Sequence, residues 1–406
     1  MRKRHKKRRV NHAYLSYSQQ FALSQIASLK STELRKNDII TTIIGATEDV
    51  IARTALVLDE HLPANINQNI VQIRVDESIA LPEYVNSYLN STYGRNYLRY
   101  LSRQTEQVNL NCQEISSVVI PNVSMAFQNN IKACVTKAYQ LQQNAKREFE
   151  NAEFLLKRII DFDDAYLPTI TCKSLAESFK ISGRLDAEYY QPKYDALFST
   201  LSKHKTIPLG GSRGLVSIKK SIEPGSEVYL EEGIPFIRVS DVDKYEISTP
   251  PIMLSKDVIP NIEDLYPKKD TILLSKDGSI GIAYKLEKDM EAVTSGALLH
   301  LTVKDSNVVL PDYLTLVLNS PIAQLQAERD CNGAIIKHWK PSDIEKVLIP
   351  ILDMSVQQEI ASTIQESFRL RAESKRLLDL AVKTVEMAIE SDEESALEWL
   401  RSKVEL

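Results

Sequence analysis

The histidines and serines of the chain show no spacing that is typical of a metal-binding or hydrolytic site. Six histidines are present: His5, His12, His61, His204, His300 and His338. None forms an H-x-x-x-H or H-x-x-E-H pattern, so we expect no metal site. There is no G-x-S-x-G nucleophile elbow, and the sequence identifies no partners for Ser295-Gly296.

Phosphate-binding loops and DNA-modifying motifs are not found either. The segment Gly210-Gly211-Ser212-Arg213-Gly214 leads into Lys219-Lys220, but it contains neither G-x-x-x-x-G-K-[ST] nor G-x-G-x-x-G. We find no Asn-Pro-Pro-Tyr-type run for amino-group methylation and no P-D…D/E-x-K nuclease set. The chain is therefore predicted to have no catalytic residues and no cofactor of its own, and to be a binding or positioning protein.

Two long amphipathic helices are predicted. After Ile349-Pro350, apolar residues recur three or four apart, as one buried helical stripe requires: Val356, Ile360, Ile364, Phe368, Leu377, Leu378, Ala381, Val385 and Ala388. At 1.5 Å per residue this helix would be roughly 50 Å long, so it needs a partner helix. The stretch after Ile120-Pro121 repeats the pattern: Phe127, Ile131, Cys134, Val135, Ala138, Leu141, Ala145, Phe149, Ala152, Leu155, Leu156 and Ile159.

The two stretches belong to an internal duplication. Leu81-Pro-Glu-Tyr84 matches Leu310-Pro-Asp-Tyr313, and Leu89-Asn-Ser91 matches Leu318-Asn-Ser320, each at an offset of 229 residues. Further upstream, Asn37-Asp38-Ile39-Ile40 is paired with Lys269-Asp270-Thr271-Ile272 at an offset of 232. A repeat over this length predicts two copies of one unit.

The rest of each copy indicates mixed α and β structure. Strands are predicted at 39–44, 54–58, 70–75 and 118–120 in the first copy, and a helix begins at Pro82 that Gly94 ends or bends. In the second copy, strands at 271–275 and 282–286 form a hairpin, for which Asp277-Gly278 favours a tight turn. After Glu390 an acidic, frayed tail is expected. The predicted fold class is α+β, with two repeated mixed α/β domains that each end in a long helix.

Charge and cysteine usage limit the cellular setting. Residues 2–9 carry seven fixed positive charges, and the net charge of −4 leaves −11 for the rest of the chain. The basic run can bind phosphate or be a solvated tail, and any other nucleic-acid site must be a local patch. The cysteines Cys112, Cys134, Cys172 and Cys331 show no paired spacing, and no membrane span or signal peptide is evident. We expect a cytoplasmic protein.

An ordered set of segments resembles the specificity subunit of type I restriction-modification systems. The set covers nearly the whole chain from about residue 31, and its segments are Arg184-Leu-Asp-Ala-Glu-Tyr-Tyr190, Gly233-Ile-Pro-Phe-Ile-Arg-Val-Ser-Asp241, Lys269-Asp-Thr-Ile-Leu-Leu-Ser-Lys-Asp-Gly-Ser-Ile-Gly281, Pro311-Asp-Tyr-Leu314, Leu348-Ile-Pro350 and Gln357-Gln-Glu-Ile360. The resemblance implies two target-recognition domains, each followed by a long helix, with the helices packed as an antiparallel coiled coil that acts as a spacer.

The resemblance also implies partners. Similar proteins read a bipartite double-stranded DNA sequence and dock two methyltransferase (modification) subunits, which restriction/translocase subunits can join. S-adenosylmethionine, Mg and ATP are then expected on the partner subunits and not on this chain. Two base-reading domains on a rigid rod would read half-sites at a fixed separation.

On this basis we expect seven segments. They are a basic, unassigned segment (1–30), a first target-recognition domain (31–123), a first spacer helix (124–162), a linker (163–183), a second target-recognition domain (184–352), a second spacer helix (353–390) and an acidic tail (391–406). The second copy has 85 residues, from Leu185 to Lys269, before the aligned Asp270, whereas the first has 37 before Asp38. The first recognition domain is therefore expected to be truncated at its start.

Some candidate DNA contacts lie beside turns, where side chains can reach base edges or phosphate, and two lysines could neutralise the charge of the DNA backbone. In the second domain they are Lys219, Lys220, Arg238, Ser240, Lys276 and Ser279, and in the first, as weaker candidates, Thr41, Thr42 and Arg53. Surface polarity or turn chemistry is the alternative explanation for each.

Two other functions stay open. The chain could be the specificity portion of an enzyme that acts with a catalytic domain in cis. It could also be a truncated remnant that binds the methyltransferase without reading DNA. The DNA sequence itself is not encoded in any motif, because base choice depends on loop geometry and DNA shape.

Overall fold

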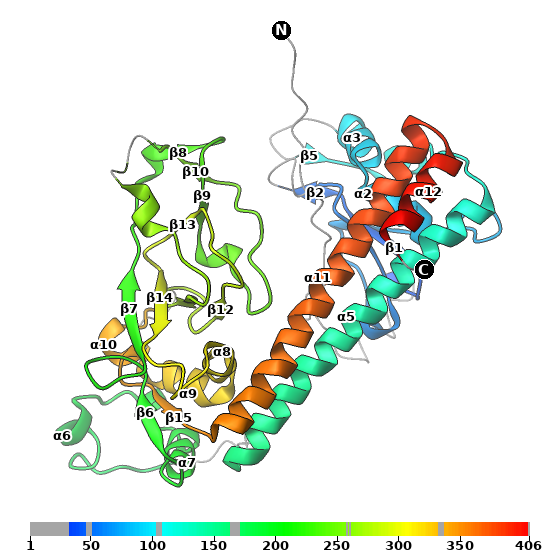
Figure 1. The fold of residues 1–406 in the computed structure, drawn as a ribbon. Coiled ribbons are helices and arrows are strands. Elements are labelled where there is room, and N and C mark those ends of the chain that lie inside the picture. The colour runs from blue at the N-terminus through cyan, green and yellow to red at the C-terminus, as the bar shows by residue number, and fades with distance from the viewer. Residues whose placement is uncertain are drawn as a thin grey trace. The chain divides into compact units, whose positions relative to one another are not determined.

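The computed structural model describes residues 32–45, 51–102, 108–162, 171–256, 259, 261–331 and 337–404. The chain divides into two compact units (Figure 1). Unit 1 consists of Met1–Asn144 and Leu370–Leu406, and unit 2 of Ala145–Arg369. No helix in the described ranges combines the length and hydropathy needed to cross a membrane.

Unit 1 is built on a small antiparallel sheet with strand order β3-β1-β4. Helices α2 and α3 follow the sheet, and the unit also contains the first half of α5, the second half of α11 and α12. Its elements are β1 (Ile39–Thr42), β2 (Ile44–Gly45), β3 (Thr54–Leu56), a 3-10 turn η3 (Asp59–His61), β4 (Ile70–Ile73), α2 (Pro82–Asn90), α3 (Thr92–Leu101), β5 (Val108–Asn109), α4 (Cys112–Ser116) and α12 (Glu393–Lys403).

Unit 2 contains two four-stranded sheets, with orders β12-β11-β14-β7 and β13-β9-β10-β8, and a pair β15-β6. The β8–β10 end and the end formed by β6, β15 and α7 lie on opposite sides of the first sheet (Figure 1). Its helices are α6 (Phe179–Ser182), α7 (Pro192–Leu201), α8 (Pro311–Asn319), α9 (Pro321–Asp330) and α10 (Pro341–Ile344), with 3-10 turns η4 (Ala187–Tyr190), η5 (Ser226–Val228), η6 (Val239–Asp241) and η7 (Ile262–Leu265). Its strands are β6 (Thr206–Pro208), β7 (Val216–Lys220), β8 (Tyr229–Leu230), β9 (Ile234–Ile237), β10 (Met253–Leu254), β11 (Ile272–Ser275), β12 (Ala283–Lys285), β13 (Val293–Thr294), β14 (Leu298–Val303) and β15 (Leu348–Pro350).

The two predicted long helices are present. Helix α5 runs from Met125 to Ile160 and α11 from Met354 to Glu390. Their apolar stripes are buried as expected, because the core of unit 1 includes Phe127 and Ile131 of α5, and that of unit 2 includes Ile360 and Ile364 of α11. The prediction of a mixed α/β chain with long helices is therefore confirmed.

Equivalent positions in the two units make the same hydrogen bonds. In unit 1, the Leu81 amide donates to Gln128 Oε1 (2.8 Å) and the Tyr84 hydroxyl to the Pro121 carbonyl (2.7 Å). In unit 2, 229 residues later, the Leu310 amide donates to Gln357 Oε1 (3.0 Å), and Tyr313 donates to Pro350 (2.8 Å). Each glutamine therefore joins the start of a short helix to the long helix that follows it.

The register of the upstream match differs by one residue from the sequence alignment. The left-handed residues are Asn37 (φ 69°) and Asp270 (φ 62°), and their amides donate to the carbonyls of Val57 and Leu286, respectively. The structural offset here is 233 and not 232. Because a slip of one residue exchanges the two faces of a strand, Asp38 corresponds to Thr271 and not to Asp270.

Three local predictions were wrong. Residues 118–120 are not a strand: their counterpart β15 pairs with β6, and the described part of unit 1 has no counterpart of β6. Gly94 does not end the helix, since the break falls at Ser91 and Gly94 lies in the first turn of α3, where a Cβ would come 2.2 Å from the Tyr88 carbonyl oxygen. Asp277-Gly278 does not form a two-residue turn, because β11 ends at Ser275 and β12 begins at Ala283.

The expectation of a frayed C-terminal tail was also wrong. Asp392 caps α12 by accepting a hydrogen bond from the Ser395 amide at 2.8 Å. Ala396, Leu400 and Val404 are buried in the core of unit 1. The acidic run Ser-Asp-Glu-Glu-Ser is the cap and first turn of a helix, where negative charge is favourable.

Candidate nucleic-acid interface

Three of the residues predicted to contact DNA lie around one loop of unit 2, residues 294–298, which joins β13 to β14. The Ser295 amide donates to the carbonyl of Ile237, next to Arg238, at 2.8 Å. The Lys276 amide donates to the Ala297 carbonyl at 2.9 Å. Lys220 approaches from β7, since a Cβ on Gly296 would lie 3.2 Å from its Cε atom. The 294–298 loop therefore brings together segments that are far apart in the sequence.

Arg238 and Ser240 flank the short turn η6. The Arg238 amide donates to Asp241 Oδ2 at 2.8 Å, and the Arg238 Nε atom lies 3.7 Å from the same oxygen. The Arg238 side chain is 40% exposed, while Asp241 is buried. Ser240 is exposed, and its Oγ lies 3.3 Å from Asp241 Oδ1. Asp241 therefore holds the turn, and the side chains of Arg238 and Ser240 remain accessible to a ligand.

Lys219 and Lys220 end the edge strand β7 and are both exposed. Lys219 Nζ donates to the Asp264 carbonyl at 2.8 Å. Its strand neighbour His300 is buried and lies 2.8 Å, by its Nε2 atom, from Thr294 Oγ1. Burial, and secondarily the charge of Lys219, lower the pKa of His300 to about 4, so this imidazole is neutral at pH 7. No carboxylate within the described ranges forms an ion pair with Lys219.

Lys276 was predicted to reach DNA from a turn, but its side chain is mostly buried. Its side chain is only 13% exposed and is ion-paired with Asp277. Asp277 also accepts a hydrogen bond from His338 Nδ1 at 2.8 Å. Burial raises the pKa of Asp277, but hydrogen bonds from Lys276 and His338 outweigh this and lower it overall. In contrast, Ser279 is exposed, and its carbonyl accepts the Ser275 hydroxyl at 2.6 Å.

The loop at 276–282 is joined to a second segment that the sequence analysis missed. The Gly278 amide donates to the Lys337 carbonyl (2.9 Å), and the Trp339 amide donates to the Lys276 carbonyl (2.8 Å). Lys337, His338 and Lys340 are exposed beside this junction. The run Lys-His-Trp-Lys, with one buried aromatic residue between cations, was the available signal, but its proximity to residue 277 could not be read from the sequence.

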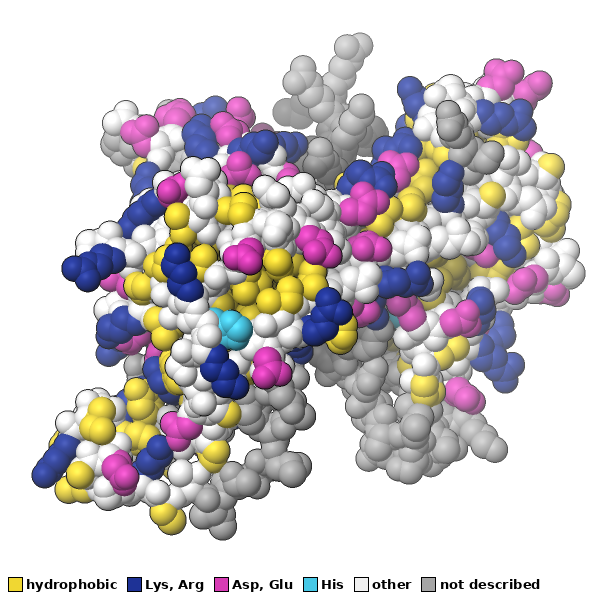
Figure 2. Space-filling view, turned by 60° about the horizontal axis from the view of Figure 1, so that its bottom comes forward, with side chains coloured by type: hydrophobic (Ala, Val, Ile, Leu, Met, Phe, Trp, Pro, Cys, Tyr) yellow, Lys and Arg dark blue, Asp and Glu magenta, His cyan; other side chains and the backbone are white. Residues whose placement is uncertain are grey.

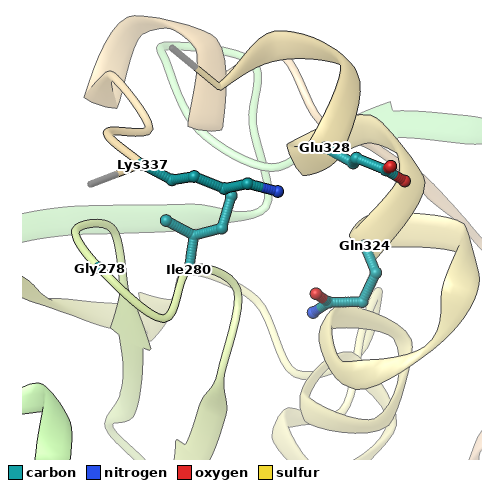
Figure 3. A pocket seen from close by; sticks show the side chains of 5 residues that line it. All are labelled: Gly278, Ile280, Gln324, Glu328 and Lys337. Carbon is teal, nitrogen blue, oxygen red and sulfur yellow. The ribbon is translucent and has the colours of Figure 1, made fainter. Parts of the chain in front are cut away.

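A pocket of about 320 Å³ lies between this loop and α9 (Figure 3). It is lined by Gly278, Ile280, Gln324, Glu328 and Lys337, and the side chain of Lys337 extends toward the helix that carries Gln324 and Glu328. Gln324 Nε2 already donates to the Gly281 and Leu318 carbonyls, and Glu328 forms an ion pair with Lys193 at 2.8 Å. The polar side chains of α9 in this pocket therefore have partners within the chain.

The candidates in unit 1 are less accessible. Thr41 is fully buried, and its Oγ1 lies 3.1 Å from Thr54 Oγ1, so it cannot contact DNA in this structure. This follows from its place on β1, whose side chains face the core at that position. The Thr42 hydroxyl accepts the Arg53 amide at 3.1 Å, and the Arg53 side chain is exposed. Of the three, Arg53 is the candidate whose side chain is exposed to solvent.

On the face shown in Figure 2, the charged side chains do not form one continuous basic patch. Lys and Arg side chains on this face are interspersed with Asp and Glu. Among the described residues, no group of three or more His, Cys, Asp or Glu side chains could hold a metal ion.

Comparisons with known proteins show which proteins this chain is similar to. Residues 214–379 match the family model "Type I restriction modification DNA specificity domain". A 123-residue stretch, 30% of this chain, is 25% identical to the type I restriction enzyme EcoBI specificity subunit of Escherichia coli. That match spans about a quarter of the relative's length, 25%.

Solved structures of this class are also similar. The HsdS subunit from Thermoanaerobacter tengcongensis is 17% identical, with 87% of this chain and 81% of that chain covered and a TM-score of 0.32. The type I restriction-modification S subunit from M. genitalium is 14% identical, with 91% and 82% covered and a TM-score of 0.36. The assignment rests on the sequence matches. Residues 214–379, most of which lie in unit 2, match a DNA specificity domain, and the resemblance to type I specificity subunits noted in the sequence is confirmed.

Proposed function

We propose that this chain is the DNA-specificity subunit of a type I restriction-modification complex, and that unit 2 reads DNA sequence. The observation that carries the proposal is the sheet of β8, β9, β10 and β13 with its 294–298 loop. This layer lies outside the elements that recur 229 residues apart, and the exposed side chains of Lys220, Arg238 and Ser240 surround it.

The exposed candidates divide by chemistry into two groups. Lys219 and Lys220, on a strand edge, are suited to phosphate, because an ammonium group is a point charge without base discrimination. Arg238 is suited to a guanine edge, since guanidinium can form two parallel hydrogen bonds to O6 and N7. Ser240 and Ser279 can donate or accept a hydrogen bond at either groove. Lys337, His338 and Lys340 extend the proposed surface on the far side of the 276–282 loop.

We propose that α5 and α11 pack as an antiparallel coiled coil and act as the spacer of the complex. In unit 1, Cys134 Sγ of α5 lies 3.3 Å from the carbonyl of Leu377 in α11. In unit 2, Ser367 Oγ of α11 donates to the Ala145 carbonyl of α5 at 2.5 Å. Residue numbers rise along one helix as they fall along the other, which supports opposite directions. Their polar flanks would dock two methyltransferase subunits, which bring S-adenosylmethionine, and restriction/translocase subunits with Mg and ATP could join.

Unit 1 offers less for base reading. The described part of unit 1 contains the counterparts of β11, β12, β14, α8 and α9 but no counterpart of the β8–β10 layer. We therefore propose that the first recognition domain contributes fewer DNA contacts, with Arg53 as its candidate. If it contributes none, the chain reads only one half of a normally bipartite target.

The test is co-expression with the cognate methyltransferase subunit, followed by sequencing that maps methylated adenines in host DNA. A two-part motif would show that both units read DNA. A one-part motif would leave unit 2 as the reader. A complex that forms but methylates no defined motif would refute sequence reading and favour the remnant that only binds the methyltransferase.

A further inference from the structure

The loop that connects β9 to β10 carries Lys244 against helix α5, within unit 2. Lys244 Nζ lies 3.4 Å from Glu153 Oε1 of α5. The same ammonium lies 4.6 Å from the centroid of the Phe149 ring and 4.9 Å from that of Tyr245. The rings of Phe149 and Tyr245 meet edge to face, with centroids 4.9 Å apart at 77°. Lys244 is thus held by one carboxylate and two aromatic faces.

The loop that holds Lys244 is tightly closed by its own hydrogen bonds. Val242 and Ile247 form an isolated antiparallel bridge, and the Asp243 amide donates to the Glu246 carbonyl at 2.9 Å. The Ser248 amide donates to the Asp241 carbonyl at 2.8 Å. Asp241 is also the residue whose carboxylate accepts the Arg238 amide. A short chain of contacts therefore leads from α5 through Lys244 to the turn that presents Arg238.

The Lys244 contact differs from the packing around the sheet of β8, β9, β10 and β13, which is the DNA-reading layer of the proposed function. This layer is held by two small cores, around Phe236 and around Ile237 and Val242, and neither core includes a residue of α5 or α11. Tyr245, in contrast, packs in the large core that contains Phe149 of α5. One further aromatic contact joins the neighbouring sheet to the other helix, with Tyr284 and Phe368 ring centroids 6.1 Å apart.

Lys244 stays charged in this place. Burial lowers its pKa, but the interactions with Tyr245 and Glu153 outweigh burial, and the pKa is raised overall. The Lys244 side chain is partly buried, with 33% of it exposed, and removing an ammonium from water is costly unless it has partners, so the cation favours the single arrangement in which carboxylate and rings all reach it.

We propose that Lys244 is a positioning residue, which fixes the DNA-reading layer of unit 2 in one orientation relative to helix α5. The inference rests on the proposed function, because α5 is there one of the two helices that dock the methyltransferase subunits. The Lys244 contact then sets the distance between the bases that unit 2 reads and the adenine that the docked subunit methylates. A misplacement of 1 Å can cost about 10²-fold in rate, so a loosened contact affects turnover before it affects base choice.

The test uses the complete complex with Lys244→Met, which keeps the aliphatic stem but removes the charge, and Lys244→Arg, which keeps the charge. Lys268→Met is the matched control, since Lys268 pairs with Asp289 at 3.5 Å with both side chains mostly exposed. Lys244→Met should lower the methylation kcat by about tenfold or more, change the DNA Kd by less than twofold and leave the motif unchanged. Lys244→Arg should retain most of the wild-type rate. A fall in kcat with an equal loss of DNA affinity, or no change in kcat or Kd, overturns the inference.

A second measurement separates this inference from the proposed function. Hydrogen exchange of the free chain does not depend on DNA or on a partner. Residues 241–248 should exchange faster in Lys244→Met than in wild type, Lys244→Arg or Lys268→Met. Unchanged exchange refutes the positioning role even if the complex methylates DNA. If exchange rises but the wild-type complex methylates no motif, the Lys244 contact stands and the proposed function fails.

Discussion

Replacing Gln357 with leucine tests the contact that joins α8 to the second long helix. Gln357 is 1% exposed. Its Oε1 accepts the Leu310 amide at 3.0 Å, and its Nε2 donates to the carbonyls of Val308 (3.0 Å) and Leu352 (2.9 Å). Leucine has a similar volume but satisfies none of these three backbone groups. At about 1 kcal/mol for each group left without a partner, the free energy of unfolding should fall by about 3 kcal/mol.

Urea denaturation of the free chain, followed by circular dichroism, measures this change. The neighbouring substitution Gln358→Leu is the control, since Gln358 is exposed, and it should change the unfolding free energy by less than about 0.5 kcal/mol. Gln128→Leu makes the equivalent change in unit 1. It removes the bonds to the Leu81 amide and the Val123 carbonyl and should cost about 2 kcal/mol. Equal midpoints for Gln357→Leu and Gln358→Leu would refute the reasoning.

Three further predictions concern DNA binding, pH and the C-terminal helix. Lys219→Gln and Lys220→Gln should weaken DNA binding at all sequences and reduce the slope of log K against log salt by about 0.9 for each phosphate that is no longer neutralised, measured by fluorescence anisotropy; an unchanged slope would contradict phosphate contact. Burial alone would raise the pKa of Asp38, but Arg74 helps hold this pKa below its ordinary value of 3.8. The ion pair therefore stabilises the folded state above pH 3.8, and this stabilisation is lost as the pH falls through the lowered pKa. The unfolding free energy of Asp38→Asn should therefore approach that of wild type at pH 3 but not at pH 6, and a constant difference would count against the ion pair. Leu400→Ala should cost about 2–5 kcal/mol in urea denaturation, because Leu400 is fully buried; a cost near zero would mean that α12 does not pack as described.

The long helices and the 229-residue repeat were predictable, because both are periodic signals carried by many residues. Single differences between the two copies, such as Ala361 at the position equivalent to Lys132, do not hide an apolar stripe of nine residues. The upstream register was not predictable. Asn37 and Asp270 adopt the same left-handed conformation although their side chains and neighbours differ, and only the backbone hydrogen bonds show which residues correspond.

The candidate site was only partly predictable, because accessibility is set by long-range contacts. Arg238 and Ser240 are exposed beside a turn, as their sequence indicated. Lys276, beside an equally clear turn, is held by Asp277, which His338 fixes from 61 residues away. The role of Lys244 could not be predicted from the sequence. Its partners Phe149 and Glu153 lie about 90 residues upstream, on a helix whose sequence does not distinguish them from their neighbours.

Base reading by unit 2 can be measured by photo-crosslinking the assembled complex to its methylation motif, with 4-thiothymidine or 5-iodouracil at single motif positions. The attached peptides are then identified by mass spectrometry. If unit 2 reads the bases, crosslinks form to peptides that contain residues 238–240 or 278–279, and they are lost when the motif is scrambled. Crosslinks confined to unit 1 or to the long helices would contradict it.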